Sequence, residues 1–394
     1  MSRIAESHLS EFGSEPTVET GAPTVATLLG AVGEYNDGVC LRLVTPPSVH
    51  VALRRREDTV VRFAAPDLKE RKRASLSTIR GRKEDRWARL PKAVVQLLGA
   101  EGLVTSGADI TLQSDAPAEC GLSLTSAFTV ALIDALGRAF SFDLDSEDFF
   151  GLLQRFGSHY LRLSQNEVRR LAESARMQKF AVPGRVYACD VRRRTLQLCD
   201  WQSTLGDEIV LLSAGVPQFT EDMSLLEIEE LEAEALEALR ERRPGLSLRD
   251  YELEDLEEVR EGLSDAARRA ALFVMGENRR VEESLELMVH GDINGLGELL
   301  SASHASLREN LDLSCPEIDW LVKRGLRVEP VAGMRIHGLA YGGAVLAILR
   351  NGGRAELLEA IDDYGRIFGF TPRLYTLVSD ESAAARVSTE KLEM

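Results

Sequence analysis

The stretch Pro23-Thr-Val-Ala-Thr-Leu-Leu-Gly30-Ala-Val-Gly-Glu34-Tyr35-Asn36-Asp37-Gly38 is the segment on which the fold prediction depends. Its first half is mainly apolar, and it closes with the polar tetrapeptide Tyr-Asn-Asp-Gly. Asparagine and glycine accept a positive φ more readily than other residues do. The tetrapeptide therefore indicates a tight hairpin.

The composition is that of a folded globular protein. The chain has 394 residues, of which 44% are hydrophobic and 28% are charged, and this length is sufficient for two domains. A formal net charge of −16 disfavours nucleic acid and anionic membrane surfaces as partners. The sequence contains neither a signal-peptide core nor a run of about 18 apolar residues that could span a membrane. We therefore expect a cytoplasmic protein.

Five cysteines occur singly, without a Cys-x-x-Cys pair, which is typical of reduced thiols and offers no zinc-site spacing. One basic segment departs from the acidic character of the chain. A solvated loop or strand edge is its simpler interpretation, and a contact with phosphate or with a partner is the alternative. The segment comprises Lys69, Arg71, Lys72, Arg73, Arg80, Arg82, Lys83 and Arg86, interrupted by Glu70, Glu84 and Asp85.

Strand-like and helix-like patterns alternate along the whole chain, which predicts an α+β protein. The acidic segment 221–242 has leucines at helical spacing and is interpreted as the solvated face of an amphipathic helix, with an acidic docking surface as the alternative. Strands are predicted within 39–64 and at 108–114, 185–190, 207–216, 338–349 and 373–378. Helices are predicted at 90–98, 126–140, 149–176, 221–242, 253–263, 266–290 and from 354.

The opening stretch resembles the galactokinase segment Pro-Gly-Arg-Val-Asn-Leu-Ile-Gly-Glu-His-Thr-Asp-Tyr-Asn-Asp-Gly. The arginine of that segment is replaced by Val25, and its Glu-His pair is replaced by Ala31-Val32. The resemblance implies that Glu34, Tyr35, Asn36 and Asp37 contact a monosaccharide. The hairpin and the sugar-binding interpretations both stay open. The framework of the segment is kept at Pro23, Leu28, Gly30, Tyr35, Asn36, Asp37 and Gly38.

A second segment, 115–127, follows a predicted strand and opens an apolar helix. It is similar to the phosphate loop Pro-x-Gly-x-Gly-Leu-Ser-Ser-Ser-Ala-Ala of GHMP kinases, the superfamily that includes galactokinases. Helix N-termini attract phosphate oxygens. However, Glu119 replaces the first glycine and Leu124 the middle serine, and a carboxylate at this point disfavours a triphosphate. A helix start without a ligand is therefore the alternative to nucleotide binding. The resemblance assigns the nucleotide to Gly121, Leu122, Ser123, Thr125 and Ser126, and Mg²⁺ to Thr125.

The catalytic aspartate of galactokinases has no counterpart, because no aspartate occurs between Asp148 and Asp190. Its position falls on Glu173, Ser174 or Gln178, and Glu173 is the only candidate base. The helix glutamate expected between 157 and 162 is also missing. General base catalysis contributes about 10²–10⁴-fold to a rate, so these losses predict a severe loss of activity.

The remaining similarity extends to about Val378. It includes Glu277-Asn278-Arg279-Arg280-Val281 and Leu313-Ser-Cys-Pro-Glu-Ile-Asp319, which we interpret as structural. The third GHMP motif is altered around Gly338, Gly342 and Gly343, and His337 replaces its threonine. His337 is interpreted as a hydrogen-bonded core histidine, with a polar site residue as the alternative.

The resemblance implies a two-domain GHMP-kinase fold. Residues 1–205 would form a domain similar to ribosomal protein S5 domain 2, and residues 206–394 a ferredoxin-like GHMP domain. The function expected is that of a galactokinase-like pseudokinase, with residual binding of a sugar or of ATP and Mg²⁺, that acts through a protein partner. The alternatives are an active ATP-dependent sugar 1-kinase with a rebuilt site and a non-kinase enzyme on the same scaffold.

Overall fold

The computed structural model describes residues 1–31, 33, 36–199, 207–217, 222–338 and 342–378. The described chain forms two compact units. The first contains residues 1–25, 44–118 and 122–183, and the second contains residues 26–43, 119–121 and 184 onward. Both units mix strands with helices, so the α+β prediction is confirmed.

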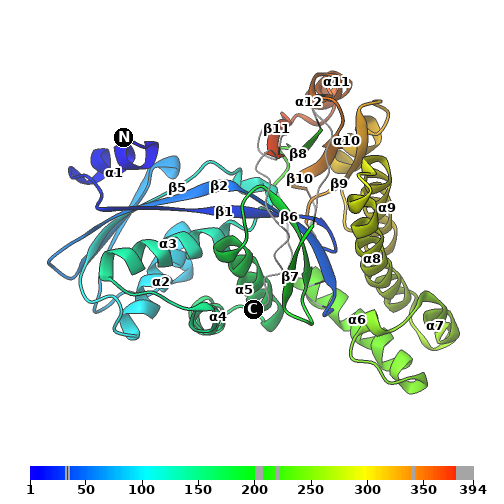
Figure 1. Cartoon of the computed structure of the whole chain (residues 1–394), viewed down its shortest axis with the longest axis horizontal. Helices are drawn as coiled ribbons and strands as arrows, with labels where there is room; N and C mark the ends of the chain where they lie inside the picture. Colours follow the sequence, from blue (N-terminus) through cyan, green and yellow to red (C-terminus); the bar gives the residue numbers. More distant parts are fainter. Residues whose placement is uncertain (32, 34–35, 200–206, 218–221, 339–341, 379–394) are drawn as a thin grey trace. The chain divides into compact units, whose positions relative to one another are not determined.

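The first unit places helices on the two faces of a sheet (Figure 1). Apolar side chains from the strands and from α2, α3, α4 and α5 form one continuous core. On the opposite face α1 packs against β5, where His8 Nδ1 lies 2.9 Å from the Thr111 hydroxyl. The strands are β1 (Val18–Leu29), β2 (Val39–Arg55), β3 (Val60–Ala65), β4 (Glu70–Ser75) and β5 (Ala108–Ser114). The helices are α1 (Arg3–Phe12), α2 (Arg89–Ala100), α3 (Leu124–Phe140), α4 (Ser146–Arg155) and α5 (Gln165–Phe180), with short turns η1 (Pro66–Leu68), η2 (Lys83–Ala88), η3 (Ala118–Cys120) and the π-helical η4 (Phe156–Leu161).

The sheet runs in the order β4-β3-β5-β2-β6-β7, and β1 pairs with β2. Strand β3 is parallel to β5, whereas β2 is antiparallel to β5. Strands β6 (Arg185–Asp190) and β7 (Thr195–Cys199) lie in the second unit and form an antiparallel pair.

The second unit also has an antiparallel sheet in the order β11-β8-β10-β9. Helices α8 and α9 pack together, and α9 and α10 contact β9 (Figure 1). Burial of β10 on both faces explains its unbroken apolar sequence Ala344–Leu349. The elements are β8 (Glu208–Ser213), β9 (Val331–Ile336), β10 (Ala344–Leu349), β11 (Arg373–Val378), α6 (Asp222–Arg242), α7 (Leu253–Glu258), α8 (Asp265–Val289), α9 (Ile293–Leu311), α10 (Pro316–Gly325), α11 (Arg354–Ala360) and α12 (Tyr364–Phe368), with turns η5 (Leu248–Asp250) and η6 (Arg260–Gly262).

Most predicted elements are confirmed, with three corrections. The helix predicted at 253–263 is two shorter pieces, α7 and η6, because the chain leaves helical geometry at Val259. The strand predicted from Gly338 begins only at Ala344, because Gly338, Gly342 and Gly343 have positive φ. The helix predicted at 149–176 is divided into α4, the π-helical turn η4 and α5, because the chain takes a positive φ at Arg162 (φ 57°). The hairpin proposed for Tyr35–Gly38 includes Tyr35, which lies outside the described residues.

Candidate functional site

The connection between β1 and β2 carries the residues predicted to bind a sugar. Glu34 and Tyr35, and also Val32, lie outside the described residues. Gly30 begins the connection at φ 78°, and its N–H donates a 3.0 Å hydrogen bond to Glu277 Oε2 on α8. A Cβ at Gly30 would lie 2.3 Å from the Val39 carbonyl oxygen. Only glycine therefore fits this turn.

Asn36 is buried and is held by helix α6. Its side chain hydrogen-bonds to the carboxyl group of Glu232. Burial raises the pKa of Glu232 to about 8, although the hydrogen bond from Asn36 opposes this shift. The Oε1 atom of Glu232 is buried and has no hydrogen-bond partner within the described part of the chain. Glu232 was not singled out in the sequence, because it is one of many acidic residues in segment 221–242.

The backbone carbonyls of Asp37 and Gly38 both accept hydrogen bonds. The Asp37 carbonyl accepts a 3.1 Å hydrogen bond from Arg249, and the Gly38 carbonyl accepts a 3.0 Å hydrogen bond from the Val191 N–H. Arg249 also forms a bidentate pair with Asp190, at 3.0 and 2.9 Å. The retained Asn-Asp-Gly residues thus have structural contacts that require no ligand.

Val25 and Ala31, at two positions where the resemblance implies charged residues, are apolar and buried. Val25 is 2% exposed, and its N–H donates to the Leu122 carbonyl within the first unit. Ala31 is 9% exposed and belongs to the hydrophobic core of the second unit. These side chains can neither donate a hydrogen bond nor carry a charge.

Residues 119–121, in the middle of the predicted phosphate loop, belong to the second unit and are hydrogen-bonded within it. Glu119 Oε1 accepts a 3.4 Å hydrogen bond from the Ser213 hydroxyl on β8. The carbonyl of the neighbouring Cys120 accepts a 2.8 Å hydrogen bond from His337 Nδ1. Burial raises the pKa of the Cys120 thiol to about 12, so this thiol is not a nucleophile at neutral pH.

His337 is a structural residue, as the sequence indicated. Since the Cys120 carbonyl can only accept and the Thr27 N–H can only donate, the proton must reside on Nδ1, and Nε2 accepts from Thr27 at 3.2 Å. Burial lowers the pKa of His337 to about 4. The imidazole is therefore neutral at physiological pH and links β1 to the loop at Cys120.

The end of the loop forms the start of α3. Ser123 has φ 55° and its side chain does not cap the helix. Its carbonyl accepts hydrogen bonds from the Ser126 hydroxyl at 2.8 Å and from Gln178 Nε2 at 3.2 Å. Gly121 and Thr125 are exposed, Ser123 is half-buried, and Leu122 and Ser126 are buried. Within the described residues, no group of three His, Cys, Asp or Glu side chains could hold a metal ion.

Helix α5 contains all three positions proposed for the missing base. Its segment Leu171–Gln178 is buried, and Glu173 is the one carboxylate in it. Glu173 Oε2 lies 3.0 Å from Arg176 Nη2, so this carboxylate is engaged in an ion pair within its own helix. Ser174 and Gln178 are neutral, and Gln178 Oε1 is buried without a hydrogen-bond partner among the described residues.

The Glu277-Asn278-Arg279-Arg280 block lies on α8 and forms a buried ionic network. Glu277 accepts from Arg280 Nε at 2.8 Å and lies 3.7 Å from Arg335, which is fully buried. Arg335 donates to the Leu28 carbonyl at 3.1 Å. The two arginines keep the pKa of Glu277 low despite its burial. This network positions the end of β1, which agrees with the structural role inferred from the sequence.

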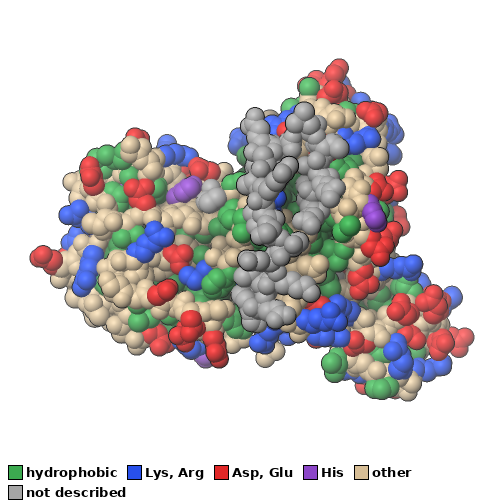
Figure 2. Space-filling model, viewed as in Figure 1, with side chains coloured by type: hydrophobic (Ala, Val, Ile, Leu, Met, Phe, Trp, Pro, Cys, Tyr) green, Lys and Arg blue, Asp and Glu red, His purple; other side chains and the backbone are tan. Residues whose placement is uncertain are grey.

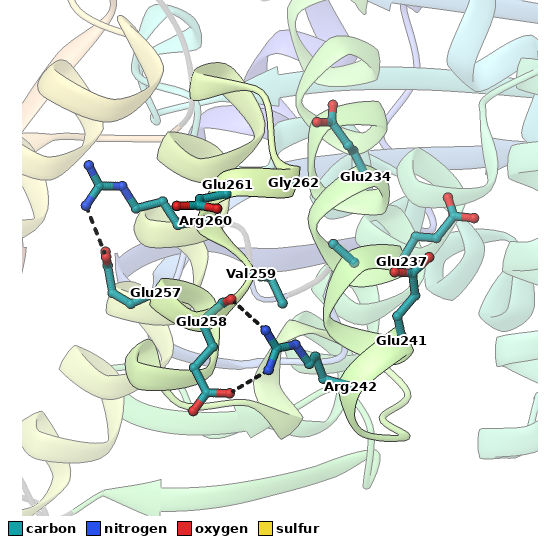
Figure 3. A pocket seen from close by; sticks show the side chains of 11 residues that line it. Glu234, Glu237, Glu241, Arg242, Glu257, Glu258, Val259, Arg260, Glu261 and Gly262 are labelled. Atoms are coloured by element: carbon teal, nitrogen blue, oxygen red, sulfur yellow. Dashed lines mark hydrogen bonds and ion pairs between the residues drawn. The ribbon is translucent and has the colours of Figure 1, made fainter.

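A separate acidic groove of about 1010 Å³ lies along α6, α7 and η6 (Figure 3). Glu234, Glu237 and Glu241 line its α6 side, and none of the motif residues described above lines it. Arg242 pairs with Glu258 at 3.4 Å and Arg260 with Glu257 at 3.7 Å. Acidic and basic side chains intermix over α6 and α7 (Figure 2), as expected for a solvated face.

Comparisons with known proteins agree with the resemblance seen in the sequence. Residues 89–174 match the family described as GHMP kinases N terminal domain. The chain is 31% identical over 390 residues to a Treponema pallidum protein named "Putative galactokinase", covering 97% of this chain and 96% of that protein. It is 28% identical over 371 residues to the galactokinase of a Roseiflexus species, covering 91% of each chain.

Solved structures show the same fold. A Lactococcus lactis galactokinase complexed with galactose aligns with a TM-score of 0.82 at 20% identity, over 95% of this chain and 97% of that chain. A mevalonate kinase aligns with a TM-score of 0.65 at 13% identity, over 91% and 98%. The predicted GHMP-kinase fold is confirmed. Among the described residues, no helix is long and apolar enough to cross a membrane.

Proposed function

Since this chain belongs to the galactokinase family of GHMP kinases, we propose that it is a pseudokinase that has kept the family fold but phosphorylates sugar weakly or not at all. The observation that carries the proposal is the lack of an unpaired carboxylate in the buried part of α5. Its buried segment offers one carboxylate, Glu173, and that carboxylate is paired with Arg176 at 3.0 Å. No free base is therefore available on the helix that resembles the one bearing the catalytic aspartate.

The loss of stabilising charge supports the same proposal. Phosphoryl transfer depends on positioning and on electrostatic stabilisation of the negative charge that spreads over the transferred group. Val25 and Ala31 are buried among apolar groups and supply no charge. Glu119 adds a carboxylate to the phosphate loop, where it opposes the binding of an anionic nucleotide.

The family implies ATP and Mg²⁺ as cofactors, but the described residues fit them poorly. Thr125 is the single hydroxyl proposed for the metal, and no carboxylate cluster accompanies it in the parts of the chain described. The exposed start of α3 still presents N–H groups without a side-chain cap. We therefore propose that any residual nucleotide binding uses Gly121, Ser123 and Thr125 and is weak.

Residual sugar binding rests on the loop between β1 and β2. The Lactococcus lactis neighbour is complexed with galactose, and a monosaccharide is the corresponding ligand proposed here. Asn36 is already hydrogen-bonded to Glu232, and the Asp37 backbone is held by Arg249. Sugar contacts are proposed for Glu34, Tyr35, Asn36 and Asp37, and of these Asn36 and the Asp37 backbone are held in place before a ligand arrives. We also propose that the protein acts by binding a protein partner.

The proposed domains are residues 1–205 and residues 206–394.

The rival function is an active ATP-dependent sugar 1-kinase that uses Glu173 as its base and His337 as a polar site residue. The contacts of His337 disfavour it, because both ring nitrogens are already hydrogen-bonded. The test is ATP turnover with Mg²⁺ against a panel of monosaccharides, for the native chain and for Glu173→Gln. We expect no sugar-dependent turnover in either protein. A sugar-dependent rate that is lost in Glu173→Gln would establish the rival.

Thermal shift separates a ligand-binding relic from a scaffold that binds nothing. Galactose and ATP are added separately, at concentrations up to 10 mM, to the native chain and to Glu173→Gln. Glu167→Gln, on the same helix, is the matched control. A ligand at 100 times its dissociation constant stabilises a protein by about 2.7 kcal/mol. We expect a rise in melting temperature with galactose, and any rise with ATP should be the same in a Thr125→Asp variant, because the phosphate loop contributes little to it. A rise with Mg-ATP that is lost in Thr125→Asp would contradict the role proposed for Glu119.

A further inference from the structure

The basic segment of the sequence contributes to a groove in the first unit that the proposed function does not use. The groove has a volume of about 800 Å³. It is bordered by the segment 80–84, by α2, and by the end of α4 with η4. Six of its lining residues are cationic and two are acidic, in a chain whose net charge is −16. The cationic residues are Arg80, Arg82, Lys83, Arg89, Arg155 and Arg162.

Most of these cations are available to a ligand. Arg82, Lys83 and Arg162 are exposed, and in the described part of the chain none of them has a carboxylate within ion-pair distance. Arg155 is paired with Glu101 at 3.4 Å, but both side chains are about half exposed, at 49% and 42%. Exposed pairs of this kind are weak, typically about 0–1 kcal/mol, and an anion can displace them.

The Arg89 side chain forms part of the base of the groove. Arg89 donates from Nη2 to the Leu161 carbonyl, which ties α2 to the last residue of η4. Its Nε is buried and has no hydrogen-bond partner among the described residues. A buried guanidinium N–H without an acceptor is costly, by about 1–3 kcal/mol. The Arg89 side chain nevertheless lines the groove.

Backbone irregularities surround the same groove. The π-helical turn η4 carries His159 and Tyr160, and Arg162 directly after it has φ 57°. Arg86, within η2, has φ 53° and ψ −120°, a conformation that L-residues rarely adopt. Isolated π-turns and strained residues concentrate at functional sites, where a ligand or the surrounding fold maintains them.

We infer that this groove binds a small organic polyphosphate, with its phosphates on Arg82, Lys83 and Arg162 and its organic part against His159 and Tyr160. The volume lies in the range of about 300–1,000 Å³ that is typical of small-molecule sites. The four positive charges in excess match the charge of two or three phosphates. A nucleic acid or an acidic protein would extend beyond the groove and meet a molecule of charge −16, whereas a small anion within a Debye length of about 8 Å experiences mainly the local cations.

The test is calorimetric titration of the full chain at 0.15 M salt with ATP in the absence of magnesium and with inorganic tripolyphosphate. The groove variant is Arg82→Glu/Lys83→Glu. The matched control is Lys72→Glu/Arg73→Glu, which changes the charge equally within the same basic segment but lies on β4 outside the groove. We expect the groove variant to weaken the binding of both probes by about tenfold or more and the control to leave it nearly unchanged. Melting temperatures establish that both variants are folded.

A third variant, Thr125→Asp, distinguishes the groove from the phosphate loop, so this inference stands or falls independently of the proposed function. We expect it to leave the binding event assigned to the groove unchanged and to affect only the weak residual binding proposed for the phosphate loop. Loss of binding in Thr125→Asp with retention in the groove variant would overturn the inference. Equal loss in the two charge-reversal variants would do so as well, because it would show a response to overall charge. Tighter binding of a deca-glutamate peptide than of ATP, with the same dependence on Arg82 and Lys83, would assign the groove to an acidic protein and contradict a small ligand.

Discussion

At the scale of single residues, the side chains that hold the backbone are distinct from the positions where the resemblance implies charge. Gly30 is required by its φ of 78° and by the closeness of Val39, and Asn36 is required as the partner of Glu232. Val25 and Ala31, in contrast, are absorbed into apolar cores.

Replacing His337 by alanine should destabilise the protein by about 2–4 kcal/mol, because the Thr27 N–H and the Cys120 carbonyl would both lose their partner in a buried place. The measurement is urea unfolding at pH 7.5. The pKa of His337 is lowered from 6.5 to about 4, so its contribution is complete above pH 6.5 and disappears as the pH falls through 4. The difference between the native chain and the variant should shrink over this range.

His159→Ala provides the control for His337, because His159 is exposed on η4. It should change stability by less than about 0.5 kcal/mol. Equal effects of the two replacements, or a His337→Ala variant as stable as the native chain, would show that the link between β1 and Cys120 is not needed.

Glu232→Gln should make the protein more stable at pH 8, by an amount on the order of 2 kcal/mol. The pKa of Glu232 rises from 4.5 to about 8 on folding because of burial, so the folded state retains a proton that the unfolded state has lost. Stability from this group is complete below pH 4.5 and is lost as the pH rises to about 8. Thermal unfolding between pH 5 and pH 8 measures the effect. Glu230→Gln, at an exposed position of the same helix, is the control, and identical pH profiles for the two variants would contradict the assignment.

At the scale of elements, the sequence predicted the helices and strands with strong periodicity and missed those defined by contacts elsewhere. Helix α3 and strand β5 follow directly from their apolar patterns. Strand β9, which contains Gly333, was not predicted. In the structure this glycine allows close packing on α9, since a Cβ would lie 2.0 Å from the Gly297 carbonyl oxygen. No local pattern reports such a contact.

The turn at the end of β1 gives an element-scale prediction. Gly30→Ala should destabilise the protein by at least about 3 kcal/mol, since it combines left-handed strain with a collision at Val39. Gly13→Ala is the matched control, because Gly13 has a similar φ of 73° but nothing within 4 Å of its Cβ position. It should cost only about 1 kcal/mol. Chemical denaturation compares the two, and equal losses would show that the collision is relieved by movement of the loop.

At the scale of the whole molecule, the resemblance identified the fold and indicated the positions where we propose that the candidate site departs from its family. It could not reveal the contacts that the side chains at those positions make. The pairing of Glu173 with Arg176 and the double hydrogen bond of His337 depend on side chains placed together by folding. Glu232, which holds Asn36, had no distinctive sequence pattern because its partner is distant in the chain. Arg335 was recognised only as the arginine of the third GHMP motif, and its hydrogen bond to the Leu28 carbonyl was not predicted.

The most direct test of the central claim is a single-turnover experiment. The chain is mixed at a concentration equal to that of galactose and Mg-ATP, and sugar phosphate is followed by phosphorus NMR for a day, with buffer alone as the background. Because the described residues provide neither a free base on α5 nor a cation at Val25, we predict no sugar phosphate signal above that background. A galactose phosphate signal that approaches the concentration of the protein would contradict the account.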